Sequence, residues 1–342
     1  MESKGKKKLN SNTLLLLITI VLFIVLYAAG CIMYSSKGFT HLQTFLNILI
    51  NNAGLICVVC GMTCVMLTGG IDISVGSLVA LDCMFLCWSM AQGLNAIVAC
   101  ILVLLIGLAM GAVQGFCIGY LKIQPFIVTM AGLFFARGMT AVISTSQLSI
   151  TKDTSPLFYT WANIKIKLPF GGYTNSKGIY QVPYIRVGVV VALIVLVVIF
   201  LMLRYTKFGR SLYAVGGSEQ SASMMGLDVK KTKMKAYMLS SFLCSIGGIC
   251  YCLNTMSGSV SQATGLEMDA ISSAVIGGTL LTGGVGNVIG SFFGVLINGT
   301  ISSIVKTNGK LASSWPNILT AALLCVFIVL QSVFAYVKER RK

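Results

Sequence analysis

The run NAIVACILVLLIGLAMGAVQGFCIGY, residues 95–120, contains no charged side chain and is long enough to cross a bilayer as one helix. Its second half carries glycine at every fourth position, at Gly107, Gly111, Gly115 and Gly119. Helices in lipid gain no hydrophobic energy from meeting, so small residues on one face let them pack closely. The run therefore predicts a transmembrane helix with a glycine groove for a neighbouring helix of the same chain. An interface with another subunit is the alternative.

Nine further apolar runs have a similar character. Of the 342 residues, 56% are hydrophobic and 10% are charged, whereas soluble domains carry about 25% charged residues. We therefore expect an all-α polytopic membrane protein with about ten transmembrane helices, forming a single transmembrane domain over residues 1–342. The expected spans are 13–33, 47–68, 73–92, 95–120, 124–145, 183–203, 236–256, 268–283, 287–305 and 316–337.

The basic residues predict the orientation. With ten spans both termini lie on one side, and the segments of that side hold sixteen Lys and Arg residues against eight on the other. The positive-inside rule then places both termini in the cytoplasm of a multi-pass protein of the cytoplasmic membrane. The same bias explains the net charge of +16 without a nucleic acid partner. Residues 146–182 are the expected external loop, and 204–235 form the longest cytoplasmic loop.

The sequence lacks the residues that common catalytic and metal sites require. There is no Gly-x-x-x-x-Gly-Lys-[Ser/Thr] loop for ATP phosphates, so no cofactor is expected on this chain. Cys57 and Cys60 have the spacing of a metal or redox pair, but no second pair exists and His41 is the only histidine. We therefore expect neither an enzyme nor a metal site.

Ionisable residues are rare within the expected spans. Near the middle of the spans only Asp82 and Arg137 are charged, and either these two pair or Arg137 lies near a water-filled path. Polar but sparsely charged spans favour a neutral substrate such as a sugar. The residues expected to line its path are Asn47, Asn51, Asn52, Gln124, Arg137, Asn254 and Gln262.

A short motif occurs twice. LTGGIDISVGS, residues 67–77, shares six of eleven positions with LTGGVGNVIGS, residues 281–291. Each copy is expected to join an inward span to an outward one on the cytoplasmic side, as in a parallel transporter repeat, although glycine-rich turns can resemble one another by chance. The residues expected to form gate or structural turns are Gly69, Gly70, Asp72, Ser74, Gly76, Gly283, Gly284 and Gly286. Asp72 is expected either to cap the following helix or to act as a cytoplasmic gate.

The longest cytoplasmic loop contains FGRSLYAVGGSEQSASMMGLDV, residues 208–229. Ser218 is a good helix N-cap, Glu219 suits the positive helix start, and Gly226 can end the helix after about two turns. Ala222, Met225 and Leu227 would give it an apolar side. Such a helix is suited to enter a partner's groove, or alternatively to lie on anionic lipid headgroups.

Three motifs together resemble the ribose-type permeases of ATP-driven (ABC) sugar importers. They are GGIDISVG at 69–76, the cytoplasmic loop, and MDAISSAVIGGT at 268–279 followed by GGVG at 283–286. They stand in the family's order, and the similarity covers nearly the whole chain. Within the family, 239–241, 267–271 and 311–315 resemble galactofuranose permease subunits. The loop departs from the family at Glu219-Gln220-Ser221, where Glu-Ala-Ala is common, which leaves the match to a particular ATPase open.

The resemblance implies an ABC importer permease fold and several partners. These are a second permease subunit, the same or related; two cytoplasmic ATP-binding subunits or one fused double ATPase; an extracytoplasmic sugar-binding protein; and membrane lipid. ATP would be used by the partner subunit. Glu267 and Asp269 would contact the binding protein or cap the eighth span. The residues expected to couple this chain to the ATPase are Gly209, Gly216, Gly217, Ser218, Glu219, Ala222 and Gly226. An ion-coupled secondary sugar carrier is the alternative function.

Overall fold

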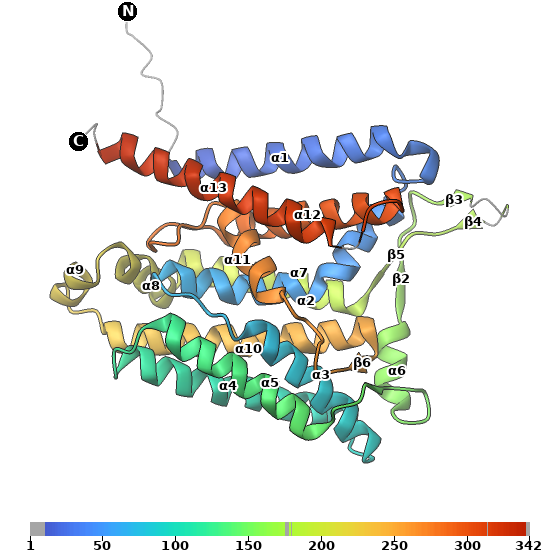
Figure 1. Ribbon diagram of the computed structural model, residues 1–342, viewed down its shortest axis with the longest axis horizontal. Helices are drawn as coiled ribbons and strands as arrows, with labels where there is room; N and C mark the ends of the chain where they lie inside the picture. The colour runs from blue at the N-terminus through green and yellow to red at the C-terminus, as the bar shows by residue number, and fades with distance from the viewer. Residues whose placement is uncertain (1–10, 175–177, 179, 313, 340–342) are drawn as a thin grey trace, which may run out of the picture.

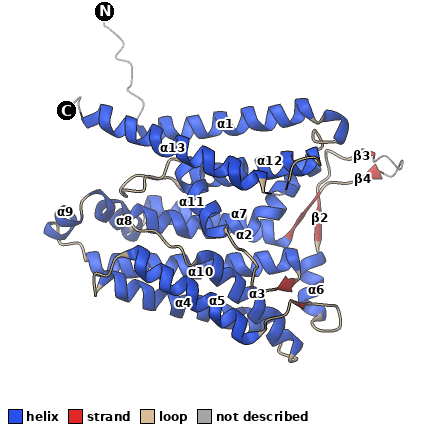
Figure 2. Ribbon diagram, viewed as in Figure 1, coloured by secondary structure: helices blue, strands red, loops and turns tan. Residues whose placement is uncertain are grey.

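The structure, a computed structural model, describes residues 11–174, 178, 180–312 and 314–339, and it is almost entirely helical (Figures 1 and 2). Within this part of the chain, eight helices are long and apolar enough to cross a membrane. They are α1 (Ser11–Met33), α2 (Leu42–Leu67), α4 (Ala96–Gly119), α5 (Pro125–Ile143), α7 (Val187–Tyr205), α10 (Val229–Thr255), α12 (Val288–Asn308) and α13 (Trp315–Glu339).

The remaining elements are short. The shorter helices are η1 (Ser35–Lys37), α3 (Val75–Ala91), α6 (Pro156–Asn163), α8 (Lys207–Gly217), α9 (Glu219–Met224) and α11 (Leu266–Ile276). The strands form three antiparallel pairs, β1 (Leu148–Ser149) with β6 (Ser257–Gly258), β2 (Lys165–Lys167) with β5 (Tyr184–Arg186), and β3 (Tyr173–Thr174) with β4 (Tyr180–Gln181).

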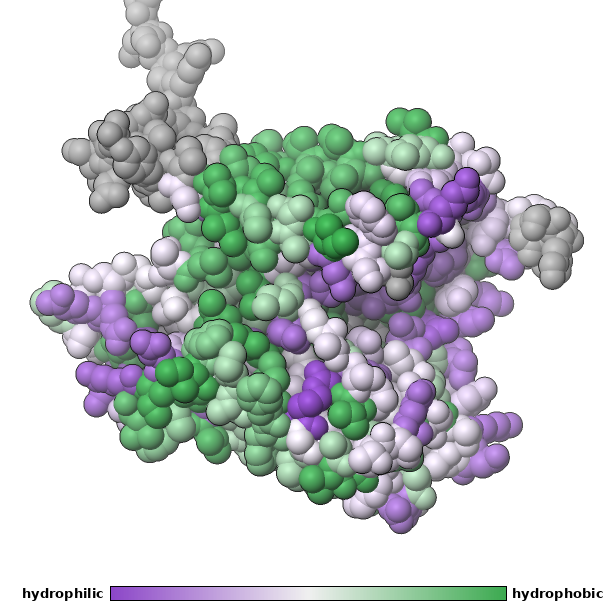
Figure 3. All heavy atoms as spheres, viewed as in Figure 1, coloured by the Kyte–Doolittle hydropathy of each residue, from purple (hydrophilic) through white to green (hydrophobic). Residues whose placement is uncertain are grey.

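Helices α2 and α10 form the centre of the bundle. Most of α2 is buried, whereas only a small share of α1, α5 and α13 is buried within the bundle. Green apolar surface covers much of the outer helices in Figure 3. An exposed apolar surface of this size is stable where lipid covers it. The expected all-α polytopic membrane fold is confirmed.

The glycines of α4 face α10. A Cβ atom on Gly111 would lie 2.7 Å from the carbonyl oxygen of Tyr237, and one on Gly115 would lie 2.6 Å from that of Met234. Real Cβ atoms do not approach backbone this closely. Close packing within the chain, as predicted from the four-residue spacing, is therefore confirmed for this face of α4.

One of the ten expected spans is broken. Helix α11 has 11 residues, about 16 Å, which is only about half of a bilayer core. The expected span 268–283 is thus helical only as far as Ile276, and residues 277–283 form a glycine-rich turn. Non-helical backbone also precedes α11, at 259–265. Hydropathy missed the break because a glycine-rich turn is as apolar as a helix.

Helix α3 begins deep in the bundle. The Cys244 thiol donates to the Val75 carbonyl at 3.1 Å, which places the start of α3 beside the middle of α10. Residues 69–74 cover the distance from the end of α2 without forming a helix. Irregular backbone at this depth is tolerated only where protein surrounds it, and here α10 and α4 do so.

Helix α1 begins, and α13 ends, at the end of the bundle where α8 and α9 lie (Figure 1). Near the start of α1, Thr19 donates to the Ile276 carbonyl at 2.7 Å; near the end of α13, Gln331 donates to the Val275 carbonyl at 2.9 Å. The basic residues of segments 1–10 and 340–342, which the orientation uses, lie outside the described residues. The opposite end carries α6 and strands β2 to β5, which form the expected external loop.

Candidate functional site

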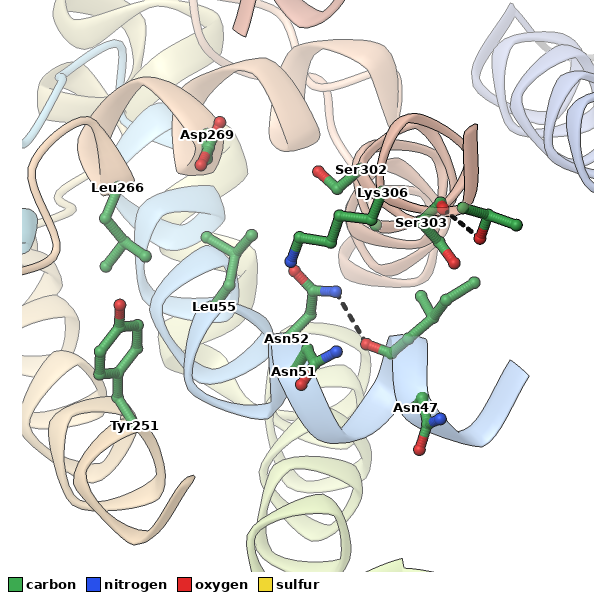
Figure 4. Close-up of a pocket in the computed structure, with 13 residues that line it drawn as sticks. Asn47, Asn51, Asn52, Leu55, Tyr251, Leu266, Asp269, Ser302, Ser303 and Lys306 are labelled. Atoms are coloured by element: carbon green, nitrogen blue, oxygen red, sulfur yellow. Dashed lines mark hydrogen bonds between the residues drawn. The ribbon is translucent and has the colours of Figure 1, made fainter. Parts of the chain in front are cut away.

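A polar cavity of about 470 Å³ enters the bundle from the end opposite α9. Helices α2, α10, α11 and α12 supply its walls (Figure 4). It reaches inward as far as the first turn of α11, so the half-length helix forms its inner boundary. Its lining residues are Asn47, Ile48, Asn51, Asn52, Leu55, Tyr251, Leu266, Asp269, Gly299, Ser302, Ser303, Lys306 and Thr307.

Several polar groups in this cavity are available to a ligand. Asn47 accepts a hydrogen bond from Gln43 at 2.8 Å, and the Asn52 amide donates to the Ile48 carbonyl at 2.7 Å. Among the described residues, no hydrogen bond engages the side chains of Asn51, Tyr251 or Asp269. An amide, a phenol and a carboxylate together offer the donors and acceptors that bind hydroxyl groups.

Three of the seven predicted path residues, Asn47, Asn51 and Asn52, meet in this cavity. Arg137 and Gln262 do not line it. Arg137 donates to the carbonyls of Val260 and Gln262 at 2.6 and 2.8 Å, so it holds the non-helical segment that precedes α11. The Gln262 amide donates to the Ser257 carbonyl at 3.0 Å and fastens the same segment.

The other two path candidates also lie elsewhere. Asn254 accepts a hydrogen bond from Arg186 at 3.0 Å, and Gln124 is an exposed residue that precedes α5 at the α9 end. The expected Asp82–Arg137 pair is wrong, because Asp82 is buried against Gly248 of α10 while Arg137 binds backbone carbonyls.

Two acidic residues lie within the bundle. Asp269 lines the cavity, and Glu267 lies beside Gly76 in the interior. Both lie in the first turn of α11, as the alternative role at the start of the eighth span expects, and contact with a binding protein stays a prediction. The sequence analysis did not predict the cavity residues of α12. Their spacing could have indicated them, because Ser302 and Lys306 are four residues apart and therefore share a helix face.

Asp72 is fully buried and holds the unwound segment in place. One carboxylate oxygen accepts from the Ser74 amide at 3.0 Å and from its hydroxyl at 2.6 Å, and the other accepts from Ser240 of α10 at 3.2 Å. Gln114 of α4 donates to the Ser74 hydroxyl at 3.0 Å. These contacts fit the cap interpretation, and they place Asp72 well inside the bundle, not at its cytoplasmic surface.

The two copies of the repeated motif touch each other and α8. The Gly284 amide donates to the Leu67 carbonyl at 2.9 Å, and a Cβ atom on Gly283 would lie 2.7 Å from the Gly69 nitrogen. At Gly216, a Cβ atom would collide with the Leu67 carbonyl. We call Gly69, Gly216, Gly283 and Gly284 the glycine junction. It joins α8 to the turn that precedes α3 and to the turn between α11 and α12.

Three junction glycines also have backbone angles that side chains disfavour. Gly69, Gly283 and Gly284 have φ values of +78°, +86° and +73°. Glycine adopts this left-handed region without steric cost. The predicted turns at both motif copies are therefore present, and Tyr213 of α8 secures the second by donating to the Gly286 carbonyl at 3.0 Å.

Helix α9 occupies the predicted position. The Ser218 hydroxyl accepts from the Ser221 amide at 3.2 Å, and Gly226 follows the helix with a φ of +80°. The apolar side differs from the prediction. Ala222 is buried, whereas Met225 is 69% exposed and Met224 is 74% exposed, so the methionines point away from the bundle. The sequence did not predict α8, whose Gly209 packs against α7 backbone.

A second hollow, of about 710 Å³, lies beside α9. Its walls include Lys122 of the α4–α5 turn and Lys230 of α10. Glu219 at the start of α9 forms an ion pair with Lys233 at 2.6 Å, which ties α9 to α10. This end of the molecule therefore presents exposed methionines, basic residues and a groove on one surface.

Residues 44–330 match the family of branched-chain amino acid transport system / permease components. The chain belongs to this permease family. The permease is 39% identical over 96% of its length to the inner membrane ABC transporter permease protein YjfF of Escherichia coli K12, and covers 94% of that protein.

Two further relatives carry sugar names. The permease is 34% identical over 95% of its length to the fructose import permease protein FruG of Bifidobacterium longum, covering 92% of it. It is 33% identical over 86% of its length to the ribose import permease protein RbsC of Escherichia coli K12, covering 87% of it. No solved structure matches the chain. The predicted resemblance to ribose-type permeases is confirmed; the finer resemblance to galactofuranose permeases stays a prediction.

Proposed function

We propose that this permease is the membrane-spanning subunit of an ATP-driven importer that carries a neutral monosaccharide into the cell. The polar cavity is the observation that supports it most. Small-molecule pockets have volumes of roughly 300–1,000 Å³, and this one presents unengaged hydroxyl-binding side chains. The relatives named for fructose and ribose import favour a monosaccharide over other neutral substrates.

The orientation follows from the basic residues. The end that carries α8 and α9 is cytoplasmic, and so are both termini. The cavity then opens to the outside, where a sugar-binding protein delivers its cargo. Helix α11 and the Asp72 segment close the path below it in this structure, which corresponds to an outward-open state.

The glycine junction supplies the mechanical link. Two ATP-binding subunits, or one fused pair, bind the surface of α9 and move it when ATP draws them together. Helix α8 transmits this motion through Gly216 to the turns at Gly69 and Gly283-Gly284, because these contacts are made between backbone atoms with no side chain in between. The first turn leads directly into α3 and the second connects α11 to α12, and displacement of these helices opens the cavity to the cytoplasm. A second permease subunit completes the path.

Reconstitution in liposomes tests this proposal. With the ATPase and the binding protein present, we expect sugar uptake that requires ATP on the α9 side, and none from this chain alone under a proton or sodium gradient. Gradient-driven uptake by the isolated chain would instead identify an ion-coupled carrier.

A further inference from the structure

A groove of about 680 Å³ runs between α4 and α5 on the outer surface of the bundle. Helix α4 packs mainly on α10, and α5 mainly on α3, so the two touch each other little. Small residues Ala109, Ala131 and Gly132 deepen the gap. The other lining residues are Leu81, Ile106, Met110, Val113, Gln114, Cys117, Ile123, Ile127, Val128 and Phe135.

The groove is unsuited to water. An ordered water needs two to four polar partners, and Gln114 is the polar lining side chain. Its amide already donates to Ser74, and the residue is 3% exposed. A hollow of this size on a lipid-facing surface needs an apolar occupant, and the surrounding bilayer supplies acyl chains.

The position of the groove fits one membrane leaflet. Cys117 and Ile123 lie near the α9 end, where Gly119 packs against the Lys230 carbonyl. Ile106 is eleven residues from Cys117 along α4, about 16 Å, so the groove covers about half of a bilayer core. This is the depth that one acyl chain of the leaflet on the α9 side occupies.

The same end provides charge for a headgroup. Lys122 forms the α4–α5 turn beside Ile123, and Lys230 lies against the end of α4. The two ion pairs in the described part of the chain use Lys231 and Lys233, which leaves Lys122 and Lys230 available. Lipids of the cytoplasmic leaflet carry negative headgroups that attract such lysines.

We propose that the α4–α5 groove binds one acyl chain of an anionic phospholipid of the cytoplasmic leaflet, with the headgroup beside Lys122 and Lys230. The leaflet assignment rests on the proposed orientation; the binding site itself does not depend on transport. Because Gln114 at the groove floor also holds Ser74, the lipid supports the buried contacts that position the Asp72 segment.

Native mass spectrometry of the purified permease, incubated with equal amounts of phosphatidylglycerol and phosphatidylcholine, tests the site. We expect wild type to retain phosphatidylglycerol several-fold over phosphatidylcholine. Ala131→Phe fills the groove and is expected to reduce retained lipid of both kinds at least fivefold. Val142→Phe, on the exposed face of α5 outside the groove, is the control and is expected to retain as much lipid as wild type. Lys122→Glu with Lys230→Glu is expected to abolish the preference for phosphatidylglycerol, and Lys152→Glu is not.

Two outcomes would overturn the proposal. One is that the Ala131→Phe variant melts at the wild-type temperature and still retains as much lipid as wild type. The other is a photo-reactive side chain at Ile127, in native membranes, that crosslinks to a second permease subunit and not to lipid. Both readouts are independent of sugar uptake, so a failure here leaves the proposed transport function standing, and the reverse also holds.

Discussion

Gly216 lies where α8 meets the carbonyl of Leu67, with no room for a methyl group. Gly216→Ala is therefore expected to push α8 away from both turns and to lower ATP-driven uptake at least tenfold, while overpacking costs about 1–3 kcal/mol of stability. Uptake by reconstituted complexes and thermal melting measure the two effects. Gly138→Ala in α5 is the matched control, because a Cβ atom there meets open space and the residue lies outside the junction. Equal uptake by both variants would contradict a role of the junction in coupling.

Asp72 accepts three hydrogen bonds from groups that are themselves buried. Asp72→Ala leaves the Ser74 amide and the Ser240 hydroxyl without this partner, at a cost of about 1–3 kcal/mol. We expect a lower melting temperature in detergent and a loss of uptake. Asp72→Asn keeps one carboxamide oxygen as acceptor and should lose less. If both variants melt at the wild-type temperature, these hydrogen bonds contribute nothing measurable to the fold.

From the sequence, the type of contact that a residue makes could be predicted better than how deep in the bundle the residue lies. Asp72 with Ser74 has the spacing of a capping pair, and glycine repeats indicate close packing, since both depend on neighbours along one chain segment. The depth of Asp72 depends on where α10 places Ser240, 168 residues away. The same limit explains Arg137, whose backbone partners Val260 and Gln262 lie 123 and 125 residues away along the chain.

Helix α9 presents Met224 and Met225 outward while Ala222 fixes it to the bundle. Exposed apolar side chains at a helix face are typical anchors for a partner's groove. Met224→Asp with Met225→Asp is expected to abolish co-purification with the ATP-binding subunit, whereas Gln220→Asp, which adds charge at another exposed position of α9, should retain it. Unchanged co-purification of the double variant would place the ATPase contact elsewhere. Its expression and melting temperature should match wild type, because neither methionine contributes to the core.

The spans were predictable where the helices are long, since α1, α4 and α7 combine length with high hydropathy. The short helix α3 (Val75–Ala91) also lies where the span 73–92 was expected, but α11 was predicted too long, because a short helix there joins apolar irregular backbone of similar composition. Helix α8 was missed for a different reason: its glycines and polar residues resemble a loop, although Thr206 caps its start by accepting from the Gly209 amide. Helix α11 belongs to the proposed path and α8 to its coupling with the ATPase, so sequence patterns were least informative at the functional parts.

At the scale of the whole bundle, a polar cavity enters at the end opposite α9 and reaches inward to the start of α11. Asn51 stands in this cavity with its side chain unengaged and exposed. A tryptophan there would fill much of the cavity without disturbing the core. Asn51→Trp is therefore expected to lower sugar uptake at least tenfold, while the assembled complex still binds its ATPase and hydrolyses ATP. Lys152→Trp, exposed in the loop at the same end, controls for an added aromatic side chain.

Measuring uptake and ATP hydrolysis on the same reconstituted complex separates two kinds of failure. Loss of both activities would mean that Asn51→Trp disturbs the coupling machinery, which lies at the far end of the bundle. Loss of uptake alone is the expected result, because the cavity and the glycine junction share no residue. Full uptake by this variant would show that the sugar crosses by another route, and the cavity would then have no part in transport.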